Sequence, residues 1–192
     1  KTGVDSHMYV RSKTSKDPTV HTRTDLFGRF YFQVLPLLNR VYGKLQVPSD
    51  DDPRSFNPAP TLSLRRHMRP QDYDVVMLHF LGHGYLNYRE IGRIRQPIVW
   101  LIHDMWPFCG GEHYTLDERR FKEGYRADNR SEGDRGWDLD RRVWRGKQKH
   151  WRNPNVAVVG ASRWISEMAK QSLLFAAADH TVIPYPLETD IY

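Results

Sequence analysis

The stretch QPIVWLIHDMWPFCGGEHY, residues 96–114, constrains the fold of this chain more than any other. It begins beside a proline, is apolar from Ile98 to Ile102, and then turns polar at His103 and Asp104. A short unbroken apolar run predicts a strand that is buried on both faces, as in a parallel sheet. Ligands of open α/β sheets bind beyond the carboxyl ends of such strands. We therefore expect His103 and Asp104 at the active edge of a parallel sheet.

Apolar strands and helical segments alternate around this stretch. A short strand is also expected near the start of the chain, over Val4–Val10. Alternation of this kind predicts a parallel sheet with helices on both faces, joined by right-handed crossovers. The sequence therefore indicates an α/β fold. The main strands are expected at Asp74–His79, Pro97–His103, Asn155–Val159 and Thr181–Pro184, and helices at Tyr88–Ile94 and Arg163–Leu174.

An earlier segment, Leu26–Leu45, has apolar residues at a spacing of three to four and predicts an amphipathic helix. Asp25 is placed to cap its first turn. Pro36 lies inside the segment, and we expect it to kink or divide the helix. The long apolar stripe favours packing against the core or a partner, and a face that lies on a membrane surface is the alternative.

Two segments lack periodic apolar residues. Residues 48–60 are rich in Asp, Pro and Ser, and we expect a loop or linker there. Residues 119–137 are charged and contain glycine, which predicts a flexible excursion. The segment that follows, Leu139–Trp151, predicts a very basic helix with aromatic and aliphatic side chains available for packing.

The length, composition and net charge of the chain limit the class of protein to which it can belong. The 192 residues suffice for one domain with a core, and no apolar run approaches the roughly 20 residues that span a bilayer. The first residues contain no apolar segment of the secretory type, and the single cysteine, Cys109, excludes an internal disulfide framework. We therefore expect a cytoplasmic location.

The net charge of +6 suits nucleic acid, an anionic membrane surface or a phosphorylated substrate, or reflects solvated helix faces alone.

His79 and His103 end two predicted strands of similar length. If these parallel strands are neighbours, roughly 4.8 Å apart, both imidazoles emerge at one edge of the sheet. A Gly-rich or aromatic loop follows each histidine and allows a ligand to approach the backbone. A histidine there can bond a sugar hydroxyl or a phosphate, or move a proton near neutral pH. The alternative is that each imidazole bonds a backbone carbonyl and only ends its strand.

Asp104 and Ser162 each have two interpretations. Asp104 can bond a substrate hydroxyl, or it can form an Asx turn into Met105–Pro107. Ser162 follows a predicted strand and is a good N-cap for the helix after it. The N–H groups at that helix terminus offer an anion site in principle, although capping alone is the favoured role.

Motif spacings exclude several classes of site. The sequence has no HExxH or paired-cysteine spacing, so we expect no metal site. It also has no GxGxxG, Walker loop or GxSxG, which argues against a complete dinucleotide site, a P-loop enzyme and an α/β hydrolase. The side chains that would otherwise suggest metal ligands are His79, His103, Asp104, Glu112 and His113.

Residues 74–114, DVVMLHFLGHGYLNYREIGRIRQPIVWLIHDMWPFCGGEHY, resemble the N-terminal domain of family 4 glycosyltransferases of the GT-B type. Bacterial members have a strand ending in HLHW, a Gly-rich turn, an EIGRI helix, a strand ending in HDMW, and GG-HY. Downstream, VVGASRWISEMAKQSLLF and VIPYPLETDIY are similar to the strand–Ser–helix segment and the interdomain junction of that family. The resemblance covers most of residues 73–192 and is weaker before them.

The resemblance implies two facing Rossmann-like domains with the active site between them. Residues 1–192 then form part of the N-terminal, acceptor-binding domain, without its first strand, and residues 184–192 form the interdomain junction. The C-terminal domain of the family binds the nucleotide-sugar, and its E-x7-E motif is absent from this sequence. The resemblance further implies sugar transfer without a metal or other cofactor, usually with retention at the anomeric carbon.

Site residues follow from the same resemblance. His103 matches the histidine beside the transferred sugar and is the expected catalytic residue. The sequence departs from the family at Glu112, where Cys is usual, and at Tyr185 and Glu188 of the junction, where Asn and Asp are usual. On the acceptor side of the cleft, the expected substrate-binding residues are His79, Gly82, Gly84, Asp104, Trp106, Gly110, Gly111 and His113.

The resulting hypothesis is hexosyl transfer from a nucleotide-sugar to a saccharide or lipid-linked acceptor, in cell-surface polysaccharide synthesis. Contact with the inner face of the membrane would suit the basic charge. A non-catalytic sugar- or partner-binding module of the same fold is the alternative. The hypothesis of a nucleic-acid-binding domain is supported by the basic charge alone, and no recognised motif supports binding of a specific nucleic acid.

Overall fold

The structure, a computed structural model, describes most of the chain. The segments outside the description are residues 1–2, 59–66, 83–84, 116–118 and 187–192. The described part is a mixed α/β structure in which helices flank a parallel sheet of four strands, as expected for one Rossmann-like half of a GT-B fold. The expected α/β class is thereby confirmed.

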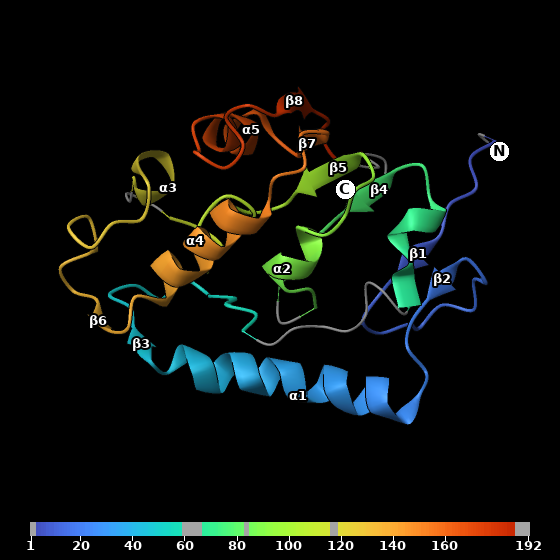
Figure 1. Cartoon of the computed structure of the whole chain (residues 1–192), viewed down its shortest axis with the longest axis horizontal. Helices are drawn as coiled ribbons and strands as arrows, with labels where there is room; N and C mark the ends of the chain where they lie inside the picture. The colour runs from blue at the N-terminus through green and yellow to red at the C-terminus, as the bar shows by residue number, and fades with distance from the viewer. Residues whose placement is uncertain (1–2, 59–66, 83–84, 116–118, 187–192) are drawn as a thin grey trace, which may run out of the picture.

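The strands of this sheet lie in the order β4-β5-β7-β8. Each neighbouring pair is parallel, so the carboxyl ends of the strands meet at one edge of the sheet. Figure 1 shows β4 and β5 side by side near the centre of the molecule. The bounds are Val76–Leu78 for β4, Ile98–Ile102 for β5, Val156–Gly160 for β7 and Asp179–Val182 for β8.

Strand β5 lies at the centre of the core. Its side chains Ile98, Trp100 and Ile102 are buried, and the residues between them are half-buried. The indole of Trp100 packs against Trp151, with ring centroids 4.8 Å apart, and against Phe175 at 5.5 Å. Large aromatic side chains bury much apolar area, so this cluster is a main source of stability for the sheet.

Short helices connect and cover the strands. Helix α2 packs against α4, and α5 packs on β7 and β8. Asn87 begins α2 with a capping box: its side chain accepts the Arg89 N–H at 2.8 Å, and Glu90 bonds back to the Asn87 N–H. The bounds are Tyr88–Ile91 for α2, Arg120–Glu123 for α3, Leu139–His150 for α4 and Arg163–Lys170 for α5.

Two small strand pairs and a 3-10 turn complete the described elements. Strands β1 and β2 pair in parallel, and β3 pairs with β6 in antiparallel fashion. The second pair joins the segment after the helix Leu26–Gly43 to the segment before α4. The bounds are Met8–Tyr9 for β1, Val20–His21 for β2, Gln46–Val47 for β3, Arg135–Gly136 for β6 and Pro70–Asp72 for the turn.

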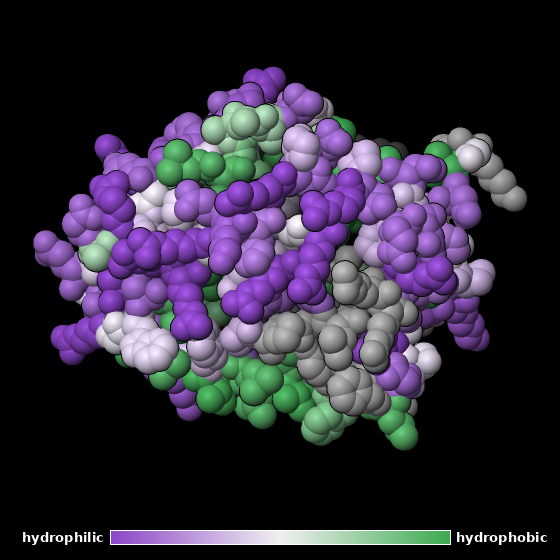
Figure 2. Space-filling model, in the orientation of Figure 1, coloured by the Kyte–Doolittle hydropathy of each residue, from purple (hydrophilic) through white to green (hydrophobic). Residues whose placement is uncertain are grey.

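Helix α1 (Leu26–Gly43) forms where the periodicity predicted a helix, and Pro36 does not divide it. It contacts the domain through the side that carries Leu35, which is buried, and Asn39, whose Oδ1 accepts the Phe56 N–H at 2.8 Å. Val34 and Tyr42 are half-buried, and the other described aliphatic and aromatic side chains of the helix are exposed, up to 85 % at Leu26. Figure 2 shows the resulting apolar strip along the lower edge of the molecule, over α1.

Only one narrow side of α1 therefore packs on the core, and packing of the rest of the stripe against a partner or a membrane surface stays a prediction. None of the helices in the described residues has the length and apolar character needed to cross a membrane.

The structure adds detail on three further segments. The strand expected over Asp74–His79 is not buried on both faces, since Val75 and Met77 are exposed, and only Val76–Leu78 form β4. Residues 119–137 pack on the domain rather than forming a loose excursion: they include α3 and β6, and Arg120 and Tyr125 are buried. The described part of residues 48–60 is a loop, which is one of the two expectations, and it packs on the domain, since Ser55, Phe56 and Asn57 are buried.

Candidate functional site

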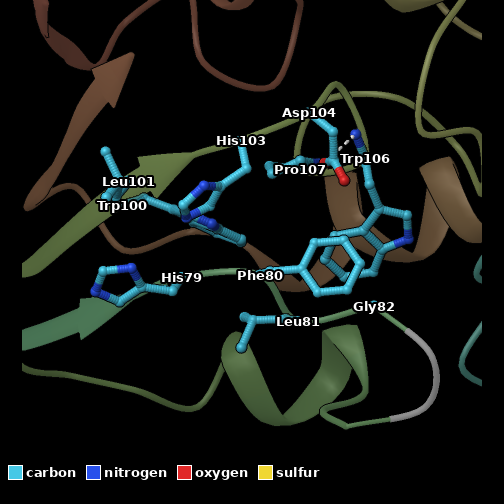
Figure 3. A pocket seen from close by; sticks show the side chains of 10 residues that line it. All are labelled: His79, Phe80, Leu81, Gly82, Trp100, Leu101, His103, Asp104, Trp106 and Pro107. Carbon is cyan, nitrogen blue, oxygen red and sulfur yellow. Dashed lines mark hydrogen bonds between the residues drawn. The ribbon is translucent and has the colours of Figure 1, made fainter. Parts of the chain in front are cut away.

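Two histidines meet at the carboxyl edge of the sheet. His79 directly follows β4 and His103 directly follows β5, and the parallel pairing of these strands brings the imidazoles together. Their ring centroids are 5.8 Å apart, and both residues are exposed. Figure 3 shows both rings beside a pocket at this edge. The adjacency expected from the sequence is present, and the chemical roles of the two histidines stay predictions. The pocket is lined by His79, Phe80, Leu81, Gly82, Trp100, Leu101, His103, Asp104, Trp106 and Pro107.

The environment of His103 favours a neutral imidazole. Partial burial lowers the pKa of His103, the neighbouring His79 lowers it further, and Asp104 raises it by a smaller amount. The Nδ1 atom of His103 shares a hydrogen bond with the hydroxyl of Tyr185. The two rings stack with centroids 5.6 Å apart and planes 16° from parallel. When the phenol donates to Nδ1, the imidazole proton resides on Nε2 and can be donated to a ligand.

Asp104 is bonded inside the protein through both carboxylate oxygens. Its Oδ1 atom accepts the Trp106 N–H at 3.1 Å, which is the Asx turn that the sequence offered as one interpretation (Figure 3). Its Oδ2 atom lies 2.5 Å from Nδ1 of His113. The Nε2 atom of His113 lies 2.9 Å from Oγ of Ser55, and all these side chains are buried. Because Ser55 is fully buried, this Ser–His–Asp chain positions the loop after His103 and presents no nucleophile to a substrate.

Gly82 and Trp106 shape the floor of the pocket. A side chain at position 82 would place its Cβ 2.9 Å from the ring of Phe80 and 3.1 Å from the ring of His113, so glycine lets these groups close together. The indole N–H of Trp106 donates to the carbonyl of Ser55 at 2.7 Å. Trp106 lines the pocket although it is almost wholly buried, so it supports the site more than it offers contact area.

Gly110 and Gly111 are buried and do not line the pocket, whereas the buried ring of His113 packs against Phe80 and Gly82 of the pocket lining. The N–H of Gly110 donates to the hydroxyl of Tyr125, and the N–H of Gly111 donates to Oδ1 of Asp140, each at 3.0 Å. These two amides already have partners inside the protein, and the acceptor-side roles of the three residues stay predictions. Their close packing explains the glycines, since a Cβ at position 111 would lie 2.6 Å from the ring of Phe56.

Lys147 packs against the loop that contains Gly110 and bonds to its backbone. It belongs to the basic helix α4, but its side chain is fully buried instead of solvated. Its Nζ atom donates to the carbonyls of Cys109 at 3.0 Å, of Gly110 at 2.7 Å, and of Trp106. The ammonium also lies 3.9 Å from the centre of the Trp106 ring, a cation–π contact. Burial lowers the pKa of Lys147 to about 7.

The remaining expectations concern Ser162, Gly84 and metal ligands. Ser162 caps α5 by accepting the Ile165 N–H at 3.4 Å, and anion binding there stays a prediction. Gly84 lies outside the described residues. Across the described part of the chain, no group of three or more His, Cys, Asp or Glu side chains is placed to hold a metal ion.

Sequence reasoning missed two residues that touch this site. Ser55 was assigned to a linker, and its bond to His113 joins positions 58 residues apart, so no local pattern could have revealed it. Tyr185 was noted only as a departure from the family at the junction. Its position just after β8, at the carboxyl edge of the sheet, is the signal that could have placed it near His103.

The chain matches the family model described as Glycosyltransferase Family 4 over residues 17–190. Comparisons with curated proteins and with solved structures gave no match. The matched segment contains the parallel sheet, the histidine pair and the loop that ends at Tyr114. Since it spans nearly all of the sequence, the chain belongs to glycosyltransferase family 4.

Proposed function

We propose that this chain forms the acceptor side of a glycosyltransferase that moves a hexosyl group from a nucleotide-sugar to a saccharide or lipid-linked acceptor in cell-surface polysaccharide synthesis. Family membership supports sugar transfer in general. The observation that carries the proposal is the exposed pair His79 and His103 at the carboxyl edge of the sheet, where parallel α/β sheets bind ligands.

His103 has the geometry of a hydrogen-bond donor to the reacting sugar. Transfer breaks the bond between the anomeric carbon and the diphosphate oxygen and forms a bond from that carbon to an acceptor hydroxyl. Negative charge grows on the diphosphate as the bond breaks. With Nδ1 held by Tyr185, the Nε2–H of a neutral His103 is directed by a stacked ring and stabilises that charge or the donor sugar.

The test is transfer by the full-length enzyme with His103→Ala. Loss of one well-placed donor to developing charge lowers kcat by about 10²–10³ in comparable sites. His103→Gln should recover part of the loss because an amide can still donate. His7→Ala, which changes an N-terminal histidine remote in sequence from the sheet edge, is the matched control. Turnover by His103→Ala within a few-fold of the wild type would refute the role.

We further propose that transfer requires no resident metal or cofactor. The N–H groups at the start of α5, which Ser162 caps just after β7, offer the diphosphate partners that need no metal ion. Dialysis against EDTA, followed by assay with and without added Mg²⁺ or Mn²⁺, tests this proposal. Activity that vanishes on dialysis and returns only with the metal would overturn it.

Contact with the inner face of the membrane is proposed for the surface formed by α1 and α4. Helix α1 exposes apolar side chains and carries no acidic residue. The exposed side chains of α4 include Arg142, Arg145 and Lys149. Figure 2 shows the polar band over α4 directly above the apolar strip over α1. Apolar insertion beside cationic side chains is the pattern of peripheral binding to anionic lipid.

Vesicle sedimentation tests this contact. Binding should be stronger to phosphatidylglycerol vesicles than to phosphatidylcholine vesicles, and Leu37→Glu with Val41→Glu should weaken it. Val4→Glu, an exposed apolar residue outside α1, is the control. Equal sedimentation of the α1 variant and the wild type would exclude this surface.

A further inference from the structure

Exposed aromatic rings continue along the carboxyl edge of the sheet beyond the histidine pair. Tyr114 is 46 % exposed and Trp164 is 51 % exposed. Their rings stack, with centroids 6.4 Å apart and planes 22° from parallel. Contiguous exposed apolar surface marks sites that bind proteins, membranes or ligands. The pair therefore needs an explanation beyond packing.

Both rings are held by ordered backbone. The N–H of Tyr114 donates to both carboxylate oxygens of Asp52, at 3.1 Å each. Trp164 lies in the first turn of α5, whose N-cap is Ser162. Helix α5 starts directly after β7, so Trp164 is fixed relative to the sheet edge. Rings positioned in advance lose little conformational entropy when a ligand binds.

Tyr185 connects this pair to the candidate catalytic residue. Its ring stacks on His103 with centroids 5.6 Å apart. Burial raises the pKa of Tyr185, and the nearby phenol of Tyr114 raises it further, which places the two tyrosines as electrostatic neighbours. The stack of Tyr185 on His103 and the stack of Tyr114 on Trp164 are thus two aromatic pairs of the same region.

Aromatic faces of this kind fit one class of ligand especially well. One face of a pyranose ring presents a patch of C–H groups, and the ring hydroxyls point outward to water. Stacking that patch on an indole or phenol buries apolar area while the hydroxyls stay solvated. We propose that Tyr114 and Trp164 form a subsite that stacks against a pyranose ring of the saccharide acceptor. This inference rests on the proposed function and adds where the acceptor lies.

The experiment is saturation-transfer difference NMR on the full-length enzyme without donor. The probes are methyl α-glucopyranoside, methyl α-mannopyranoside, methyl β-galactopyranoside and methyl β-N-acetylglucosaminide, with uridine as a separate arm. At least one hexopyranoside should receive saturation on its ring protons. Trp164→Ala and Tyr114→Ala should each weaken that binding about tenfold, as truncation of an aromatic anchor does. Trp164→Phe should retain most of it.

Matched controls separate stacking from loss of fold. Trp137→Ala removes another exposed tryptophan, 57 % accessible, and should leave binding within about twofold of the wild type. Circular dichroism should show unchanged helix content in both ring variants. The inference is overturned if no hexopyranoside receives saturation, or if uridine alone receives it. It is also overturned if the Tyr114→Ala/Trp164→Ala double variant transfers as much saturation as the wild type.

The same samples distinguish failure of this inference from failure of the proposed function. His103→Ala should lower transfer by about 10²–10³, whereas the ring variants are the ones that should weaken hexopyranoside binding. If the ring variants keep binding while His103→Ala lowers transfer, the subsite is wrong and the proposed function stands. If no transfer is found with any donor, the proposed function fails, whatever the sugar binding shows.

Discussion

The Oδ2 atom of Asp104 lies 2.5 Å from the Nδ1 atom of His113, nine residues further along the chain. This contact closes the loop that begins directly after His103. Because Ser55 holds the other side of the His113 ring at 2.9 Å, the loop is fixed from two directions. The loop after His103 is therefore held by Asp104, which lines the pocket, and by His113 and Ser55, which lie behind it.

Replacing Asp104 by Ala should destabilise the protein and impair transfer together. The change leaves the His113 imidazole and the Trp106 N–H without their acceptor in a buried setting, which costs about 1–3 kcal/mol. Urea denaturation measures the free energy of unfolding. Asp128→Ala, at an exposed carboxylate, should stay within about 0.5 kcal/mol of the wild type. Equal loss in the two variants would show that the buried contact contributes nothing.

Replacing Tyr185 by Phe should lower kcat/KM about fivefold, the value of one hydrogen bond worth about 1 kcal/mol. The ring stays stacked on His103, so only the bond that orients Nδ1 is lost. Tyr185→Ala should cost more because the stacking is lost as well. Steady-state kinetics with saturating donor provide the measurement. If Phe and wild type are indistinguishable, Tyr185 does not set the tautomer of His103.

The pH profile of transfer should respond to His79. A neutral His103 is the proposed active form, so activity should fall as pH drops through the lowered pKa of His103. His79 lowers the pKa of His103, so His79→Asn should raise that pKa toward its ordinary value. The acid limb of kcat/KM should therefore move to higher pH. A limb that stays in place, or moves to lower pH, would contradict this electrostatic coupling.

Lys147→Met should be among the more destabilising single changes in the chain. It leaves the buried carbonyls of Trp106, Cys109 and Gly110 without a donor, at a cost of about 3 kcal/mol in the free energy of unfolding. Chemical denaturation at pH 6 provides the comparison. Lys149→Met, on the exposed side of the same helix, is the matched control and should have little effect.

The Lys147 effect should also depend on pH. The folded protein releases the Lys147 proton at a pKa of about 7, whereas an unfolded lysine keeps it to about 10.4. Above pH 7 the unfolded state therefore binds more protons, and the wild type gains stability relative to Lys147→Met as pH rises. The gain is at most about 1.4 kcal/mol per pH unit. A difference between the two proteins that is constant from pH 6 to about 8.5 would refute the titration.

Local sequence patterns predicted most of the main helices and strands. The apolar run ending at His103 became β5, and the serine after the next strand became the N-cap of α5. These features depend on residues within one turn or one strand, so the sequence shows them directly. The pattern did not show which side of a helix the core would cover. In α1 the periodicity predicted the helix correctly but could not tell a side that packs on the core from one left for a partner.

The sequence by itself determined the α/β class, the two histidines at strand ends, and the motif pattern of a family 4 glycosyltransferase. Only the tertiary structure decided which polar groups reach the pocket. It turned His113 and the two glycines inward, brought Ser55 and Tyr185 to the loop from far along the chain, and buried Lys147 beneath it. The physical reason is that periodicity reports local backbone geometry, whereas these hydrogen bonds close between segments that only folding brings together.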